Sequence, residues 1–275
     1  MKKFKAVFFK SIIFFFSWAI CVGLIPVPNS QNAAIWRFWA ELIPFIIIVV
    51  VTTAFLLFDK MNIKLYIKPT MLNTTLGIII GIFWLGLTVC VIDVFGGMQI
   101  DGFNHTTFLW LWFVSVFLNT IMQEMLIRGY LYQMIKKNYN MWVAMVVTTI
   151  LFVLAHGGAF EAGVISVLNV VTMSLFMTSV LEYTNSLITP IMIHFIWNGI
   201  GAIILDGVSL AEDYPHLFNM TINSSSIMFG GEYKLEGSII VLVLNIVLFV
   251  GFMLSQSKHK LRFNEIQKNI SKMGL

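Results

Sequence analysis

The chain has 275 residues, of which 59% are hydrophobic and 11% are charged. This composition is too apolar for a soluble domain of that size and indicates a polytopic membrane protein. The formal net charge of +4 does not indicate a nucleic-acid partner, because the basic residues cluster beside apolar segments, as membrane topology requires. The two cysteines, Cys21 and Cys90, lie inside apolar segments and support neither a disulfide framework nor a cysteine-rich metal site.

A helix needs about 20 apolar residues to cross the hydrocarbon core of a bilayer. Candidate segments of this kind lie at residues 8–26, 38–58, 73–95, 107–135, 140–157, 162–182, 186–205 and 237–256. The N-terminal segment lacks a small-x-small cleavage site at a suitable distance, so a retained first span is expected rather than a signal peptide. The pattern predicts an all-α protein with about eight transmembrane helices and a single integral membrane domain over residues 1–275.

Lysine and arginine residues concentrate at the N-terminus, after the second span, at the end of the fourth span and in the C-terminal tail. Because cytoplasmic loops retain positive charge, both termini are expected on the cytoplasmic side of a plasma membrane, with a bacterial one the interpretation adopted. The basic tail is expected to be solvated or to contact anionic membrane lipid. The longest link, 206–236, carries Asp206, Glu212 and Asp213 and an Asn-Ser-Ser-Ser run.

Polar residues interrupt the fourth apolar segment, where Gln123, Glu124 and Arg128 stand among Phe, Leu, Val and Met. Groups of this kind are costly in lipid and usually mark a functional site. Glu124 and Arg128 are four residues apart and can pair along one face of a helix. Asn119 and Gln123 have the same spacing, so the segment is expected to carry a polar stripe that faces the protein interior or a water-filled cavity.

Two later segments carry polar residues that can pair with this stripe. His156 ends the fifth segment just before Gly157-Gly158, and His194 lies inside the seventh with Asn198 one turn later. A histidine at a helix end, like His156, is by itself more often structural than catalytic, and His194 alone is equally well explained by a hydrogen bond between helices. Together with Glu124 and Arg128 they need one another as partners, and tilted helices can absorb their difference in depth. A common chamber is therefore expected.

Two chemistries suit such a chamber. A carboxylate and a histidine can activate water as general base, while a second histidine and an asparagine donate hydrogen bonds to a developing oxyanion, which amounts to peptide hydrolysis without a covalent nucleophile. Alternatively, Glu124, His156 and His194 could hold a divalent metal such as zinc with an open position. No His-Glu-x-x-His motif occurs, so the first chemistry, which requires no cofactor, is favoured.

Other features have structural explanations. Gly77 and Gly81 are spaced so that a second helix can approach closely, and helix packing is the expected role. Glu41 and Asp93 fall near the outer ends of the second and third spans, where each carboxylate is expected to reach headgroups or water.

The order of the three polar motifs resembles that of the CAAX-protease and bacteriocin-processing family of intramembrane proteases, also called CPBP or Abi. The matching residues are Gln123-Glu124-x-x-x-Arg128, Phe152-x-x-x-His156 and His194-x-x-x-Asn198, the last preceded by Asn-Ser-Leu-Ile-Thr-Pro. The resemblance covers roughly residues 107–205, the family-like core. It implies a CAAX-protease-like helical bundle that cleaves peptides near the membrane, such as prenylated CAAX tails or precursors of bacteriocins and signalling peptides.

The resemblance also implies roles for the single residues. His156 would help to bind the attacking water, His194 and Asn198 would stabilise the oxyanion, and Arg128 would hold the glutamate motif. The first glutamate of the family motif, taken as the water-activating base, is Gln123 here, and a carboxamide cannot accept a proton at neutral pH.

Three interpretations follow from this substitution. In the first, the protein is an endopeptidase in which Glu124 with His156 activates water and Gln123 supports it. In the second, it is an inactive relative that binds peptides or membrane proteins as a bacteriocin-immunity or regulatory factor. In the third, the stripe serves a transporter, against which stands the absence of internal repeats and of paired broken helices in the sequence.

Overall fold

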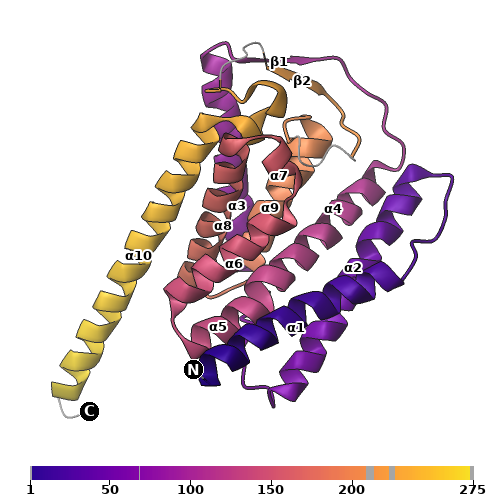
Figure 1. The fold of residues 1–275 in the computed structure, drawn as a ribbon. Coiled ribbons are helices and arrows are strands. Elements are labelled where there is room, and N and C mark those ends of the chain that lie inside the picture. The colour runs from indigo at the N-terminus through magenta and orange to yellow at the C-terminus, as the bar shows by residue number, and fades with distance from the viewer. Residues whose placement is uncertain (1, 68, 209–213, 223–226, 273–275) are drawn as a thin grey trace.

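The protein is an all-helical bundle with one small two-stranded sheet (Figure 1). The computed structural model describes residues 2–67, 69–208, 214–222 and 227–272, with side chains from residue 4 to residue 257 within these ranges. Glu212, Asp213 and the run 223–226 of the long link lie outside the described residues.

The helices follow the apolar segments in order. They are α1 (Lys2–Leu24), α2 (Ala33–Phe58), α3 (Met71–Val94), α4 (Leu109–Glu124), α5 (Tyr132–Asn138), α6 (Met141–Ala155), α7 (Gly158–Glu161), α8 (Val164–Thr184), α9 (Ile188–Asn198) and α10 (Ile239–Lys272). Two π-helical segments, η1 (Met125–Leu131) and η2 (Gly199–Ile204), continue α4 and α9, and two short 3-10 turns, η4 (Gly231–Tyr233) and η5 (Leu235–Gly237), precede α10.

Six helical stretches of the described chain are long and apolar enough to cross a membrane, and two further apolar ones, Met141–Ala155 and Ile188–Ile204, are shorter. The predicted all-α membrane fold is thus confirmed, whereas the expected count of eight full spans is not. At 1.5 Å per residue, a helix as short as α6 extends only about 22 Å, less than the roughly 30 Å of a hydrocarbon core. His156 directly follows the first of these short helices, and the second contains His194 and Asn198.

The first and the last helix begin and end on the side of the bundle away from the sheet. In Figure 1 the start of α1 and the end of α10 lie at the same end of the bundle, and the sheet lies at the opposite end. The sheet pairs β1 (Met98–Asp101) antiparallel with β2 (Asn219–Ile222) and ties the link after α3 to the long link before α10. Several helices begin at a capping side chain. At the start of α2, for example, Asn32 Oδ1 accepts hydrogen bonds from the backbone amides of Ala34 and Ile35.

Glycines on α3 bring α9 into close contact. A Cβ atom on Gly77 would stand 2.6 Å from the carbonyl oxygen of Thr189, and one on Gly81 would stand 2.8 Å from Cβ of Ile196. No larger residue fits there without a shift of α9, so the predicted packing role of these glycines is confirmed. Trp84 of α3 stacks on Trp197 of α9 with ring centroids 4.0 Å apart. These contacts fix the depth and rotation of the helix that carries His194 and Asn198.

The fourth apolar segment is one helical stretch, Leu109–Asn138, with a wider turn in its middle. The turn is η1, and Gly129 within it has a non-helical backbone (φ −73°, ψ −109°). Such π-helical turns disturb the regular rotation of side chains and often occur at functional sites. Here the turn follows Glu124 directly and contains Arg128.

The buried carboxylate of Glu182, at the end of α8, joins three helices of the bundle. It accepts hydrogen bonds from the Tyr132 hydroxyl (3.0 Å) and the Gln256 amide (3.2 Å), and it pairs with Lys136. These contacts join α5, α8 and α10 through side chains that are absent from the lining of the chamber described next.

Candidate functional site

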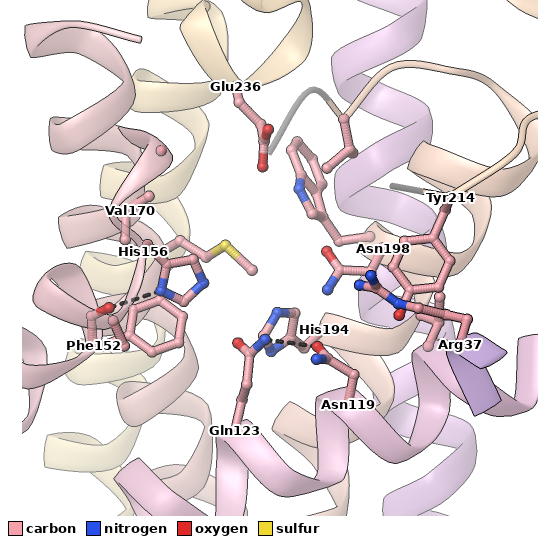
Figure 2. Close-up of a pocket in the computed structure, with 17 residues that line it drawn as sticks. Arg37, Asn119, Gln123, Phe152, His156, Val170, His194, Asn198, Tyr214 and Glu236 are labelled. Carbon is pink, nitrogen blue, oxygen red and sulfur yellow. Dashed lines mark hydrogen bonds between the residues drawn. The ribbon is translucent and has the colours of Figure 1, made fainter. Parts of the chain in front are cut away.

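A polar cavity of about 240 Å³, here called the chamber, opens between α4, α6, α9 and the links on the side of the bundle that carries the sheet (Figure 2). Its polar lining combines residues of the three sequence motifs with residues from outside them: Arg37, Asn119, Gln123, His156, His194, Asn198, Tyr214 and Glu236. The structure therefore brings Gln123, His156, His194 and Asn198 together in one space. Aromatic and aliphatic side chains, among them Phe152, Val170 and Trp197, complete the wall.

Gln123 and Glu124 are neighbours in sequence but have different surroundings. Successive residues of a helix point about 100° apart, so only one of the two can face the chamber. Gln123 lines the chamber, whereas Glu124 is fully buried behind it and is not part of its lining. Oε1 of Glu124 contacts protein side chains, and its Oε2 is buried with no hydrogen-bond partner among the described residues. The expectation that Glu124 faces the substrate as the water-activating base is not supported by this position.

Glu124 instead joins two of the motifs through one oxygen atom. Its Oε1 accepts a hydrogen bond from Nη1 of Arg128 at 2.7 Å, and it lies 2.9 Å from Nδ1 of His194. A carboxylate oxygen can only accept, so Nδ1 of His194 carries the proton of that contact. The expected pair along the α4 face is thus present, and it extends to α9.

The guanidinium of Arg128 is fully buried and well satisfied. Nε donates to the Thr178 hydroxyl at 3.2 Å, and Nη2 donates to the carbonyl and the hydroxyl of Ser174, each at 3.1 Å. The charge also lies over the Phe152 ring, 4.9 Å from its centroid. With Glu124 it forms an ion pair whose hydrogen bonds reach α8, the arrangement that a buried charge requires.

His156 follows the last turn of α6 and presents one ring nitrogen to the chamber. Its Nδ1 lies 2.7 Å from the carbonyl oxygen of Phe152, and a carbonyl only accepts, so Nδ1 carries the proton. In the neutral ring Nε2 is then an unprotonated acceptor. Figure 2 shows the ring beside the Phe152 ring at the wall of the chamber, on the side opposite Asn198 and Arg37.

Arg37 and Tyr214 line the chamber from parts of the chain that the motifs do not cover, and both contact Glu41, which is not part of the lining. Glu41 of α2 is only 5% exposed and accepts from Asn119 Nδ2 at 2.7 Å and from the Tyr214 hydroxyl at 2.9 Å. Arg37, one turn earlier, pairs with it at 2.9 Å. The expectation that Glu41 reaches headgroups or water is wrong, because these contacts enclose it. The four-residue spacing of Arg37 and Glu41 was the available signal in the sequence.

Glu236 of η5 also lines the chamber, and in Figure 2 its carboxylate points into it from the side opposite Gln123.

The alternative metal ligands, Glu124, His156 and His194, are not assembled as a metal site. Within the ranges that the structure describes, no group of three or more His, Cys, Asp and Glu side chains is placed to hold a metal ion. His194 reaches Glu124, but His156 uses its Nδ1 on the Phe152 carbonyl.

The fold and the chamber define a helical integral membrane protein with a polar site enclosed between its helices. Residues 105–200 match the family model described as type II CAAX prenyl endopeptidase Rce1-like. The resemblance seen in the sequence is confirmed for this segment, about a third of the chain, which includes all three polar motifs. Arg37, Glu41, Tyr214 and Glu236 lie outside it. Comparisons with curated proteins and with solved structures gave no match.

Proposed function

We propose that the protein is an intramembrane endopeptidase that hydrolyses a peptide bond of a membrane-associated substrate in the chamber. The observation that carries the proposal is the position of His156, whose Nδ1–H is held by the Phe152 carbonyl at 2.7 Å in a chamber that also contains His194 and Asn198. A base with its free nitrogen turned toward a water-accessible space, and donors placed in the same space, are the requirements of acyl transfer to water. The Rce1-like match of residues 105–200 supports the same class of reaction.

In the proposed reaction His156 Nε2 removes a proton from water as the water oxygen forms a bond to the scissile carbonyl carbon. The carbonyl electron pair moves to its oxygen, which becomes an oxyanion. When this intermediate collapses, the carbon–nitrogen bond breaks and the proton on His156 passes to the leaving amine. Atoms and charge balance without a metal or a covalent intermediate, so no cofactor enters the proposed mechanism.

Asn198 and His194 act on the oxyanion in this scheme. Asn198 donates from its amide, and His194 donates from Nε2–H, which requires the ring to be protonated on both nitrogens. Glu124 is then the counter-ion that holds this imidazolium through Nδ1, at the 2.9 Å contact. Gln123 cannot take a proton, but its Oε1 can accept a hydrogen bond from the water and orient it. Glu124 and Gln123 therefore have supporting roles.

The position of the chamber between membrane helices supports a membrane-associated peptide as the substrate class. A peptide segment that lies in or near a bilayer, such as a lipidated C-terminus or a precursor, can reach a site between membrane helices. We assign the protein to a plasma membrane with both termini on the cytoplasmic side, on the distribution of Lys and Arg. Membrane lipid is then its permanent environment.

The test is cleavage of a quenched-fluorescent farnesylated CAAX peptide, together with a set of unlipidated precursor peptides, by purified protein in lipid nanodiscs. Wild type is expected to cleave at least one of them, and His156→Ala and Asn198→Ala are expected to lower kcat by about 100-fold or more. Cleavage that is unchanged in both variants shows a contaminating protease and removes the assignment of the site. Absence of cleavage by wild type for every peptide removes the proposed activity.

A second function, binding without catalysis in bacteriocin immunity or regulation, is favoured by one observation. The family-like motif has a carboxamide at position 123, and the neighbouring carboxylate of Glu124 is not part of the chamber lining. In that case wild type binds peptide but does not cleave it. Restoring a carboxylate at position 123, by Gln123→Glu alone or together with Glu41→Gln, is then expected to create cleavage where wild type has none, while peptide affinity stays within about threefold.

A further inference from the structure

A chain of hydrogen bonds leads from a buried carboxylate to the chamber. Glu41 Oε2 accepts from Nδ2 of Asn119 at 2.7 Å, and Oδ1 of Asn119 accepts from Nε2 of Gln123 at 2.7 Å. The Oε1 atom of Gln123 is buried at the wall of the chamber and has no hydrogen-bond partner among the described residues. In Figure 2 this oxygen lies on the side of the amide away from Asn119, toward the wall that carries His156.

The direction of this chain is fixed at its first member. A carboxylate has no proton to donate, so Glu41 forces Asn119 to present its NH₂ group and to leave its oxygen for the next contact. That oxygen can be satisfied only by a donor, so Gln123 presents its own NH₂ group to Asn119 and its carbonyl oxygen to the chamber. Two amides that could each be turned by 180° are thereby held in one orientation.

We infer that Glu41 is a positioning residue that makes Gln123 act as a hydrogen-bond acceptor toward the water in the chamber. The inference rests on the proposed function, in which that water attacks the peptide bond. An acceptor is what the water needs on this side, since one of its protons passes to His156 and the other must be held. With the amide reversed, Gln123 would offer N–H groups to the water and to His156 Nε2, and it would compete for the base.

Two donors besides Asn119 surround the Glu41 carboxylate. Arg37 pairs with it at 2.9 Å, and the Tyr214 hydroxyl donates to it at 2.9 Å. Burial, together with the Glu41 carboxylate, raises the pKa of Tyr214 well above its usual range, so this hydroxyl stays protonated and remains a donor. These donors surround a carboxylate that is 5% exposed, which compensates for its removal from water.

The hydrogen-bond chain from position 41 through Asn119 to position 123 also accommodates a carboxylate at only one of its two ends. With glutamate at both positions 41 and 123, the Asn119 amide oxygen would face a carboxylate at one of two contacts that now measure 2.7 Å. Glu41→Gln combined with Gln123→Glu lets the chain run in the opposite direction. The amide introduced at position 41 then donates to Asn119, and Asn119 donates to the carboxylate introduced at position 123. Position 41 therefore decides whether a carboxylate at position 123 is tolerated.

The experiment compares Glu41→Gln, Gln123→Glu and the double variant Glu41→Gln/Gln123→Glu in nanodiscs, with the peptide that wild type cleaves, or with the full peptide set if wild type cleaves none. Glu182→Gln is the matched control, because Glu182 is also 5% exposed and hydrogen-bonded but does not line the chamber or contact Asn119. Thermal melting of each variant checks folding. The separation of kcat from KM distinguishes positioning of the water from loss of peptide binding.

Glu41→Gln is expected to lower kcat about 10- to 100-fold with KM nearly unchanged, since the chamber loses a fixed acceptor, while Glu182→Gln stays within about threefold of wild type. The double variant is expected to exceed both single variants in kcat. Equal kcat values for Glu41→Gln and Glu182→Gln, or a Gln123→Glu variant as active as the double, overturn the inference and leave the proposed function standing. If Glu41→Gln does not fold, the comparison of Gln123→Glu with the double variant decides alone. If wild type cleaves no peptide, the proposed activity is removed, and cleavage by the double variant but not by Gln123→Glu still supports the link between positions 41 and 123. No cleavage by any of these proteins removes the inference as well.

Discussion

Glu124 and His194 are separated by 70 residues in sequence, yet Oε1 of the first lies 2.9 Å from Nδ1 of the second. Both side chains are almost completely buried, and the same oxygen also accepts from Arg128. One carboxylate therefore joins the start of the π-helical turn after α4 to the middle of α9. The contact places a proton on Nδ1 of His194 and leaves the other ring nitrogen for the chamber.

The first prediction concerns this contact. Glu124→Gln keeps the shape of the side chain but removes its charge, which leaves the Arg128 guanidinium buried without its counter-ion. A loss of about 3–5 kcal/mol of stability is expected from breaking a buried pair on one side. Cleavage is expected to be lost as well, because His194 is no longer held as an imidazolium. Thermal or denaturant unfolding in detergent micelles measures the first effect, and the peptide assay measures the second.

Asp93→Asn serves as the control for Glu124→Gln, since Asp93 is an exposed carboxylate at the end of α3. Its stability is expected to stay within about 0.5 kcal/mol of wild type. The double variant Glu124→Gln/Arg128→Met removes the uncompensated charge and is expected to recover part of the lost stability without recovering cleavage. A single variant as stable as Asp93→Asn would contradict the structural role given to the pair.

The second prediction is a fall of kcat in acid. The proposed reaction needs a neutral His156, so protonation of this ring removes the base. His156→Gln has no titrating ring at this position, and its residual cleavage is expected to lack this acid fall. Cleavage assays over about pH 3 to 8 compare the two proteins. An acid fall that persists unchanged in His156→Gln rules out this assignment.

The sequence predicted the polar stripe and the meeting of three motifs, but it could not tell which of two adjacent residues faces the chamber. Gln123 and Glu124 differ by one step of about 100°, and the disturbed helix that follows Glu124 makes a projection of faces ambiguous. The glycine pattern of α3 was more informative. A small residue every four positions on an apolar helix has few uses other than close packing, and Gly77 and Gly81 do pack on α9.

The residues outside the motifs were harder to find. Glu41 contacts Asn119 across 78 residues and Tyr214 across 173, and no local spacing reports such contacts. A carboxylate near the end of a span is normally explained by access to water, and this argument failed for Glu41 because the long link before α10 folds over it through Tyr214. Contacts of this kind depend on how a loop packs, which the periodicity of the spans does not determine.

The third prediction concerns metal dependence. The proposed mechanism uses protein side chains alone, so cleavage is expected to be unchanged after dialysis against EDTA and after addition of zinc at low micromolar concentration. The assay is run on the same nanodisc preparation before and after treatment, with metal content measured by mass spectrometry. Loss of cleavage on treatment and its return with zinc would mean that a bound metal ion, and not His156 alone, activates the attacking water.

The last prediction tests how α3 holds the active helix in place. Gly77→Ala and Gly81→Ala each add a methyl group where a Cβ would stand 2.6 Å and 2.8 Å from atoms of α9, so a loss of about 1–3 kcal/mol in stability is expected from overpacking. Gly86→Ala on the same helix is the matched control, because nothing lies within 4 Å of a Cβ at that position. Since α9 carries His194 and Asn198, kcat is expected to fall with Gly81→Ala and to remain at the wild-type value with Gly86→Ala. Equal stability and equal kcat for the three variants would mean that the position of α9 does not depend on these glycines.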